Sequence, residues 1–272
     1  MTGISKIIRY GAVYAVLSAA AFVSIFPFYW MLVGATNTSA DIVKGKSTFG
    51  DALFSNIQTL LQQVDLGRVF YNSAQLAIVG TVLTLLISSM AGYGFEIFRS
   101  RFREKIFGML LLLLSIPFAA LMVPLFMMVS LTGFANSFIA VVMPGVASIF
   151  IIFYFRQATK AFPLELRDAA RVDGLKEWQI FLFVYIPAMR STYAAATIIV
   201  FMLTWNNYLW PLIVLQTPDK TTITLAISAL TSAYSPDFGV ILVATILATL
   251  PTLVLFFVLQ RQFVAGMLGS VK

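Results

Sequence analysis

Six long apolar stretches constrain the fold of this 272-residue chain more than any other feature. They cover residues 11–34, 70–95, 106–130, 138–156, 191–215 and 239–260. A helix needs about 20 residues to cross the hydrocarbon core of a bilayer, and each stretch is close to that length or longer. The chain is 60% hydrophobic and only 11% charged, whereas soluble domains carry about 25% charged residues. The sequence therefore predicts an all-α integral membrane protein with six transmembrane helices, forming a single domain over residues 1–272.

Lys and Arg are distributed unequally between the loops. If both termini are cytoplasmic, 14 of the 18 basic residues fall on the cytoplasmic side. Positively charged loops stay in the cytoplasm, so this bias predicts cytoplasmic N- and C-termini. The first apolar run follows Lys6 and Arg9 as in a signal peptide, but it is longer than the apolar region of a signal. We therefore expect it to be a retained first span.

The distribution of ionisable residues argues against several kinds of site. The chain contains no His and no Cys, the usual ligands of zinc. All 11 acidic residues fall outside the centres of the spans, although a proton- or sodium-coupled carrier ordinarily has an ionisable group there. No glycine-rich phosphate loop of the form G-x4-G-K-[ST] is present. We expect no catalytic residue, metal or cofactor in this chain, and we expect the energy for transport to come from outside the membrane.

Glycine and proline residues within the spans predict kinks or breaks. They are Gly92, Gly94, Pro117, Pro124, Pro144, Pro211 and Pro251. Membrane helices tolerate such residues where neighbouring segments satisfy the freed carbonyl groups. Simple kinking is the main interpretation, and a moving pathway would also use such kinks.

The loop at 157–190 carries the most informative pattern. Pro163 suits the first turn of a helix, and Glu165 and Asp168 place negative charge near the positive N-terminal end. Gly174 can adopt the left-handed conformation that ends a helix, and Pro187 marks the return to the membrane. The small-residue face of this helix contains Leu166, Ala169 and Ala170. Such a face can enter a groove on another protein, and an amphipathic helix lying on the membrane surface is the alternative.

The same loop resembles a known family motif. Asp168-Ala169-Ala170, Gly174 and Val184-Tyr185-Ile186-Pro187 match the spacing of the EAA loop of ABC importer permeases, E-A-A-x3-G-x9-I-x-L-P, with three conservative replacements. Nearly the whole chain resembles the maltose-type, carbohydrate-uptake permeases. The supporting fragments are Asn72-Ser73-Ala74, Gly92-Tyr93-Gly94-Phe95, Phe98-Arg99-Ser100-Arg101-Phe102, Ile116-Pro117, Val123-Pro124-Leu125 and Thr204 to Pro211.

The resemblance implies a type I ABC importer permease, a non-catalytic subunit of the bacterial inner membrane. Its EAA loop is the coupling helix that docks on the cytoplasmic ATPase. The implied coupling residues are Glu165, Asp168, Ala169, Ala170, Asp173, Gly174 and Pro187. The implied partners are a second homologous permease, two ABC ATPase subunits that bind the ATP and Mg, an extracytoplasmic solute-binding protein and a sugar-like solute. Nucleic acid is not expected.

Two further segments are candidates for contacts on the outer side. Candidate residues of the solute pathway are Trp205, Asn206, Asn207 and Tyr208, because adjacent amides are costly against lipid. An aromatic belt at the membrane interface is the alternative. Candidate contacts with the binding protein are Tyr234, Pro236 and Asp237, with an ordinary turn as the alternative.

The C-terminal segment from Gln260 to Lys272 resembles the cytoplasmic end of the family, which can contact the ATPases. Membrane anchorage by a snorkelling Arg261 is the competing interpretation. Two other classes of protein stay open on the residues alone. One is a secondary transporter or channel for small solutes, and the other is a membrane scaffold that transports nothing.

Overall fold

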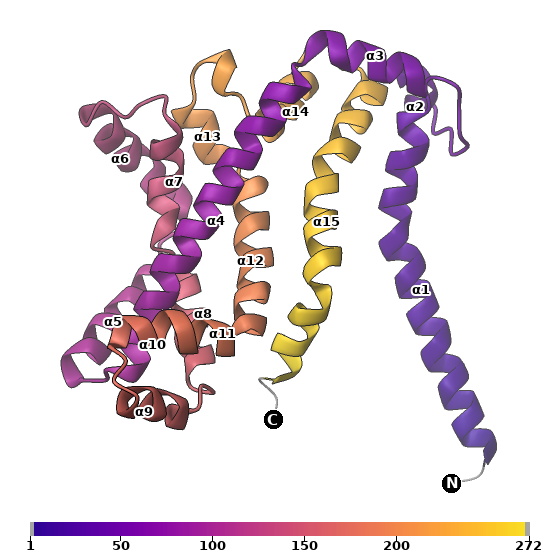
Figure 1. The fold of residues 1–272 in the computed structure, drawn as a ribbon. Coiled ribbons are helices and arrows are strands. Elements are labelled where there is room, and N and C mark those ends of the chain that lie inside the picture. Colours follow the sequence, from indigo (N-terminus) through magenta and orange to yellow (C-terminus); the bar gives the residue numbers. More distant parts are fainter. Residues whose placement is uncertain (1–2, 270–272) are drawn as a thin grey trace. The chain divides into compact units, whose positions relative to one another are not determined.

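The computed structural model describes residues 3–269, with side chains described for residues 10–264, and within this range it contains helices and no strands (Figure 1). By length and composition, four helical segments can cross a membrane: Tyr10–Ala35, Leu66–Ile97, Arg190–Val214 and Phe238–Val264. Two bent helix pairs raise the number to six if each pair is one span. The six apolar stretches are thus recovered as four long segments and two broken ones. Ser270 to Lys272, the end of the predicted cytoplasmic tail, lie outside the described residues.

The first broken pair joins α5 (Arg101–Leu113) to α6 (Phe118–Leu131), and the chain bends there by 102°. Pro117 lies at the break and takes an extended conformation with ψ 135° immediately before α6. Because proline fixes φ and disfavours a helical conformation at the residue before it, α5 cannot run on into α6. The kink predicted at Pro117 is therefore a break, and the predicted span 106–130 is not a straight helix.

The second broken pair joins α7 (Phe138–Val146) to α8 (Ile149–Thr159), with a bend of 42°. Pro144 lies inside α7, three residues before the break. Proline has no N–H, so the carbonyl of Ala140, four residues earlier, lacks its helical partner. Trp210 Nε1 donates a hydrogen bond to that carbonyl at 3.0 Å. A neighbouring segment thus satisfies the freed carbonyl, as expected for proline in a membrane helix.

The described residues divide into two compact units. Unit 1 comprises residues 1–65 and 226–249, and unit 2 comprises residues 66–225 and 250–272. The single domain over 1–272 stays a prediction. Unit 1 contains α1 (Gly3–Ala35), α2 (Ser39–Val43), α3 (Leu53–Gln63), most of α14 (Ile223–Thr231) and the first part of α15 (Phe238–Gly269).

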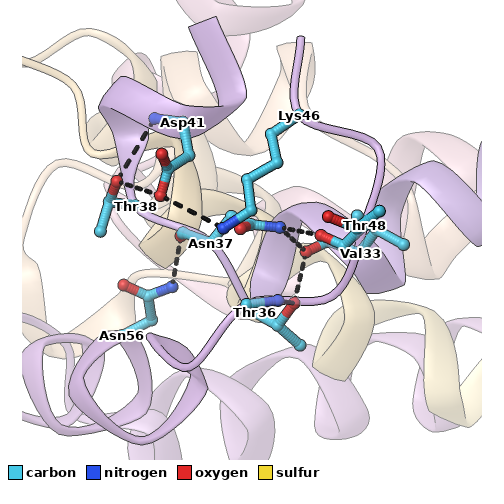
Figure 2. Close-up of polar contacts among 9 residues, drawn as sticks. Val33, Thr36, Asn37, Thr38, Asp41, Lys46, Thr48 and Asn56 are labelled. Atoms are coloured by element: carbon cyan, nitrogen blue, oxygen red, sulfur yellow. Dashed lines mark hydrogen bonds and ion pairs between the residues drawn. The ribbon is translucent and has the colours of Figure 1, made fainter. Parts of the chain in front are cut away.

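A polar cap closes the end of α1 in unit 1 (Figure 2). The amide nitrogen of buried Asn37 donates to the carbonyls of Val33, at 2.9 Å, and Thr48, at 2.8 Å. Buried Asn56 of α3 donates in turn to the carbonyl of Asn37 at 3.0 Å. A Cβ at Gly239 in α15 would lie only 2.7 Å from that same carbonyl. The predicted outer loop therefore has a defined fold, in which side-chain amides bind backbone carbonyls at the end of α1 and beyond it.

Unit 2 is built around α4 (Leu66–Ile97), which packs along α7, α8 and α12 (Arg190–Trp205). Gly92 makes the approach to α8 possible, because a Cβ there would lie 2.7 Å from Phe155 Cβ and 2.8 Å from the backbone nitrogen of Arg156. Gly94, two residues later, has open space around it. Both glycines lie inside the uninterrupted helix α4, so the kinks predicted at Gly92 and Gly94 do not break it.

Side chains near the start of α4 form hydrogen bonds with the loop that follows α12 and α13 (Leu209–Val214). The amide of Asn72 donates to the carbonyls of Asp219 and Thr221, both at 2.9 Å. The hydroxyl of Ser73 accepts from the backbone nitrogen of Ile223 at 2.8 Å. The fragment Asn72-Ser73 thus fixes one end of unit 2. The loop at 157–190 lies at the other end, beside the last turns of α4 (Figure 1).

Candidate functional site

The loop at 157–190 folds as a helical hairpin. Its first arm is α9 (Leu164–Val172), which begins after Pro163, and its second arm comprises α10 (Glu177–Ile180), the π-helix η1 (Phe181–Tyr185) and α11 (Ile186–Ala188). Gly174 turns the chain between the arms with φ +83°, a value that side chains with a Cβ rarely adopt. The backbone nitrogens of Leu175 and Gly174 donate to the carbonyls of Ala170 and Arg171, both at 3.0 Å. This is a Schellman helix end, and the glycine at its centre is the one that the sequence predicts.

The two central alanines of the hairpin differ in exposure. Ala169 is exposed, whereas Ala170 is buried at 6% exposure. Glu165, Asp168 and Asp173 are exposed. Three large apolar side chains of α9 are exposed as well, namely Leu164, Leu166 and Val172. The free face of α9 therefore combines acidic and apolar side chains around one exposed methyl group.

Glu177 joins the first arm of the hairpin to the second. Its carboxylate accepts from Nη2 of Arg167 at 2.7 Å and from Nε of the same guanidinium at 3.3 Å. Arg171, on the next turn of α9, pairs with it more loosely at 3.6 Å. Burial lowers the pKa of Arg167, but the hydrogen bonds and the charge of Glu177 outweigh this and raise that pKa overall. The guanidinium is therefore always charged.

The hydroxyl of Tyr93 on α4 donates to the same Glu177 carboxylate at 3.3 Å. Around it lies an aromatic cluster in which Tyr93 contacts Phe181 and Tyr185, with ring centroids 5.4 and 4.8 Å away. The Tyr185 and Thr159 hydroxyls lie 2.6 Å apart, within the buried part of the hairpin. The second arm is thus packed firmly against the end of α4.

A buried ion cluster lies where α8 enters the hairpin. Arg156, with a side chain 7% exposed, pairs with Glu96 of α4 at 3.4 Å and with Glu104 of α5 at 2.5 Å. Its guanidinium also lies 4.0 Å from the centre of the Phe107 ring. The hydrogen bond from Arg156 lowers the pKa of Glu104, against a smaller effect of desolvation. These contacts place the loop between α4 and α5 on the same side of unit 2 as the hairpin.

A cavity of about 370 Å³ lies among α4, α7, α8 and α12 in unit 2. Its polar lining consists of Thr84, Ser148, Thr204 and Asn207, and Phe118, Pro144 and Leu203 are among its apolar lining residues. Its volume falls within the range of roughly 300–1,000 Å³ that is typical of small-molecule sites.

This chain is similar to proteins of known families. Residues 85–269 match the family model described as "Binding-protein-dependent transport system inner membrane component". The matched range contains the whole hairpin and most of unit 2. This chain belongs to that family. It is accordingly a membrane permease component, and the predicted family resemblance is confirmed.

Several relatives extend this result to nearly the whole chain of the permease. The lactose transport system permease protein LacG of Rhizobium radiobacter is 65% identical over 259 residues, covering 95% of each chain. The arabinooligosaccharides transport system permease protein AraQ of Halalkalibacterium halodurans is 32% identical, covering 93% of this chain and 92% of the relative. A chain of a bacterial ABC transporter for the import of the acidic polysaccharide alginate superposes with a TM-score of 0.82 at 21% identity, covering 97% of this chain and 99% of that one. The predicted fold of an ABC importer permease is thereby confirmed.

The four candidate pathway residues of the permease do not share one environment. Asn207 lines the cavity, and Thr204, three residues earlier, lines it with Asn207. Trp205 is buried and stacks on Phe201 at 5.7 Å. Asn206 caps the end of α12, and Tyr208 precedes α13. Of the four candidates, Asn207 is the one that lines the cavity, and solute contact by Trp205, Asn206, Asn207 and Tyr208 stays a prediction.

The outer candidate residues are also divided. Tyr234 is fully exposed. The carboxylate of Asp237 instead accepts from the hydroxyl of Ser39 at 2.8 Å and from the backbone nitrogen of Gly239 at 3.1 Å. Asp237 therefore caps the N-terminus of α15. Binding-protein contact by Tyr234, Pro236 and Asp237 stays a prediction.

Sequence reasoning did not select Arg167, Glu177, Tyr93 or Arg156. Arg167 and Glu177 are ten residues apart on different arms of the hairpin, and Tyr93 is 84 residues from Glu177. Neither spacing matches the three- and four-residue separations at which side chains meet on one helix. No local signal identifies these pairs, because the turn at Gly174 and the packing against α4 create them.

Proposed function

We propose that this chain is a permease subunit of an ATP-driven, binding-protein-dependent importer of lactose or a closely related disaccharide. The observation that carries the proposal is the 65% identity with a lactose transport permease across 95% of both chains. The chain would form the pathway with a second homologous permease and receive solute from an extracytoplasmic binding protein. It would be non-catalytic and hold no cofactor, and two partner ATPases would bind ATP and Mg. We place both termini of the chain in the cytoplasm of a bacterial cell.

The hairpin supports the coupling role. The exposed face of α9 combines a small residue, Ala169, with acidic and apolar neighbours, and such a face fits a groove on another protein. Nucleotide can shift the pathway only if the docked surfaces interact differently in the inward-open and outward-open states. A helix that is held rigidly can transmit such a difference, and the Schellman turn at Gly174 provides one fixed end.

The cavity supports sugar contact by this subunit. Sugar hydroxyls donate and accept hydrogen bonds, and the Thr84, Ser148 and Thr204 hydroxyls together with the Asn207 amide offer both functions. Phe118 supplies an aromatic side chain to the same cavity. We expect Asn207→Leu to raise the KM for solute with little change in ATP hydrolysis at saturating solute. An unchanged KM would place the solute elsewhere.

The direct test of the proposed function is reconstitution of the complete assembly in lipid vesicles with labelled lactose. ATP-dependent accumulation is expected, and it should exceed accumulation of an arabino-oligosaccharide or of sn-glycerol 3-phosphate. Accumulation without the ATPase subunits would favour a secondary transporter or a channel. Assembly without accumulation of any of the three solutes would favour a scaffold.

The exposed Ala169 of α9 tests docking on the ATPase. Ala169→Trp should leave the permease folded, since Ala169 is exposed, but should block assembly with the ATPase by filling the groove. If the purified Ala169→Trp assembly kept normal solute-stimulated ATP hydrolysis, the docking role of α9 would be wrong.

Because the chain has no cysteine, Asp173→Cys and Thr217→Cys also allow the two sides of the membrane to be distinguished by impermeant thiol labelling.

A further inference from the structure

We propose that Glu177 is a positioning residue that fixes α9 to α4, so that a displacement of α9 during the ATPase cycle moves α4 with it. The inference rests on the proposed coupling function. It assigns to Glu177, Arg167 and Tyr93 a role distinct from contact with the ATPase, namely transmission of movement inside the permease.

Arg167 points away from the free face of α9. Its side chain is 14% exposed, whereas Glu165, Asp168 and Ala169 on the same helix are exposed. Arg167 therefore belongs to the inner face of α9. Its guanidinium forms two hydrogen bonds with the Glu177 carboxylate, and two parallel bonds fix orientation as well as distance.

The Glu177 carboxylate that binds Arg167 also contacts α4. Tyr93 of α4 donates to it at 3.3 Å. The Arg167 guanidinium also lies 5.4 Å from the centre of the Phe98 ring, which follows the last residue of α4. A continuous chain of contacts thus runs from α9 through Glu177 to the end of α4, and the cation–π contact runs beside it.

The other contacts of α9 restrain its orientation less. The aromatic cluster of Tyr93, Phe181 and Tyr185 joins the second arm of the hairpin to α4, and it contains no residue of α9. The described side chain that α9 buries is Ala170, whose single methyl group gives little directional restraint. The polar link through Glu177 is therefore the contact best placed to set the angle between α9 and α4.

The measured quantity in the test is the number of solute molecules accumulated per ATP hydrolysed by the reconstituted assembly. Glu177→Gln and Arg167→Gln should each lower this ratio about three- to fivefold, the upper part of the range expected for one partly exposed charged pair. ATP hydrolysis should stay within about twofold of wild type, since neither residue lies on the free face of α9. Tyr93→Phe as a single substitution should lower the ratio of solute accumulated to ATP hydrolysed. Added to Glu177→Gln, it should cause no further decrease in that ratio.

The double variant Glu177→Gln/Arg167→Gln should be no worse than the more impaired single variant, because either change alone breaks the pair. Lys160→Gln removes one positive charge from an exposed position of the same loop and should leave the ratio unchanged. A purely structural role would instead lower uptake and ATP hydrolysis together, in proportion to the assembled complex, and would overturn the proposal. Additive losses in the double variant would also overturn it. Failure of the wild-type assembly to accumulate solute would refute the proposed function. The wild-type measurement therefore tests that function separately from the positioning role, which only the variants test.

Discussion

Gly92→Ala tests whether the close approach of α4 to α8 holds unit 2 together. The added Cβ would lie 2.7 Å from Phe155 Cβ and 2.8 Å from the backbone nitrogen of Arg156. Non-bonded heavy atoms prefer separations of about 3.5–4.0 Å, so the helices must separate by roughly 0.7 Å or more. Backbone atoms cannot rotate out of the way as a flexible side chain can. Overpacking of this kind costs about 1–3 kcal/mol.

Gly94→Ala is the matched control for this substitution. It lies on the same helix, adds the same methyl group and has nothing within 4 Å of the new atom. Replacing glycine by alanine inside a helix contributes about 1 kcal/mol of stability, and both variants gain it. The difference between the two variants therefore isolates the steric cost, and we expect Gly92→Ala to be about 1–3 kcal/mol less stable than Gly94→Ala.

Thermal unfolding of the purified permease in detergent measures this difference. At about 2–4 °C per kcal/mol for a chain of this size, the melting temperature of Gly92→Ala should lie roughly 2–12 °C below that of Gly94→Ala. Equal melting temperatures for the two variants would refute the reasoning, because they would mean that α4 and α8 can separate at no cost.

Three further predictions concern the ion cluster and the hairpin. Arg156→Ala leaves two carboxylates without their buried partner and should lower the free energy of unfolding by roughly 3 kcal/mol, whereas Arg99→Ala, at a side chain 55% exposed, should cost less than about 1 kcal/mol in the same denaturation assay. Gly174→Val forces a β-branched residue to φ +83° and should abolish solute-stimulated ATP hydrolysis while the spans stay folded by circular dichroism. Because the pKa of Glu104 is lowered in the folded state, its contribution is present above pH 4.5, the unfolded value, and is lost as the pH falls through the lower folded-state pKa. The melting temperature of wild type should therefore fall more steeply below pH 4.5 than that of Glu104→Gln, and parallel pH profiles would contradict this.

The features predictable from the sequence are those that one stretch of chain determines by itself. The spans follow from runs of apolar residues, because the bilayer acts on each run separately. The turn at Gly174 and the break at Pro117 follow from the backbone freedom of glycine and the restriction of proline. The sequence pattern assigned Ala169 and Ala170 to one small-residue face, so it did not predict that Ala169 is exposed and Ala170 is buried.

The features that the sequence did not predict depend on contacts between distant segments. Gly92 is read as a kink in isolation, and only the neighbouring helix α8 shows that the glycine is needed for close packing. Arg156 counts as a cytoplasmic positive charge in the sequence, but it is buried between two carboxylates supplied by α4 and α5. Trp210 suggests an aromatic residue at the membrane interface, but its indole donates a hydrogen bond to the carbonyl that Pro144 leaves without a helical partner.

The opposite exposure of the two neighbouring alanines limits how the α9 segment can evolve. Each residue of an α-helix is rotated by about 100° from the one before it. Inserting or deleting one residue between Pro163 and Ala169 would therefore rotate the remainder of α9 about its axis and bring a different side chain to the free face. Substitutions at the exposed acidic positions do not change the rotation of α9 about its axis. Related permeases should accordingly keep the length of this segment constant.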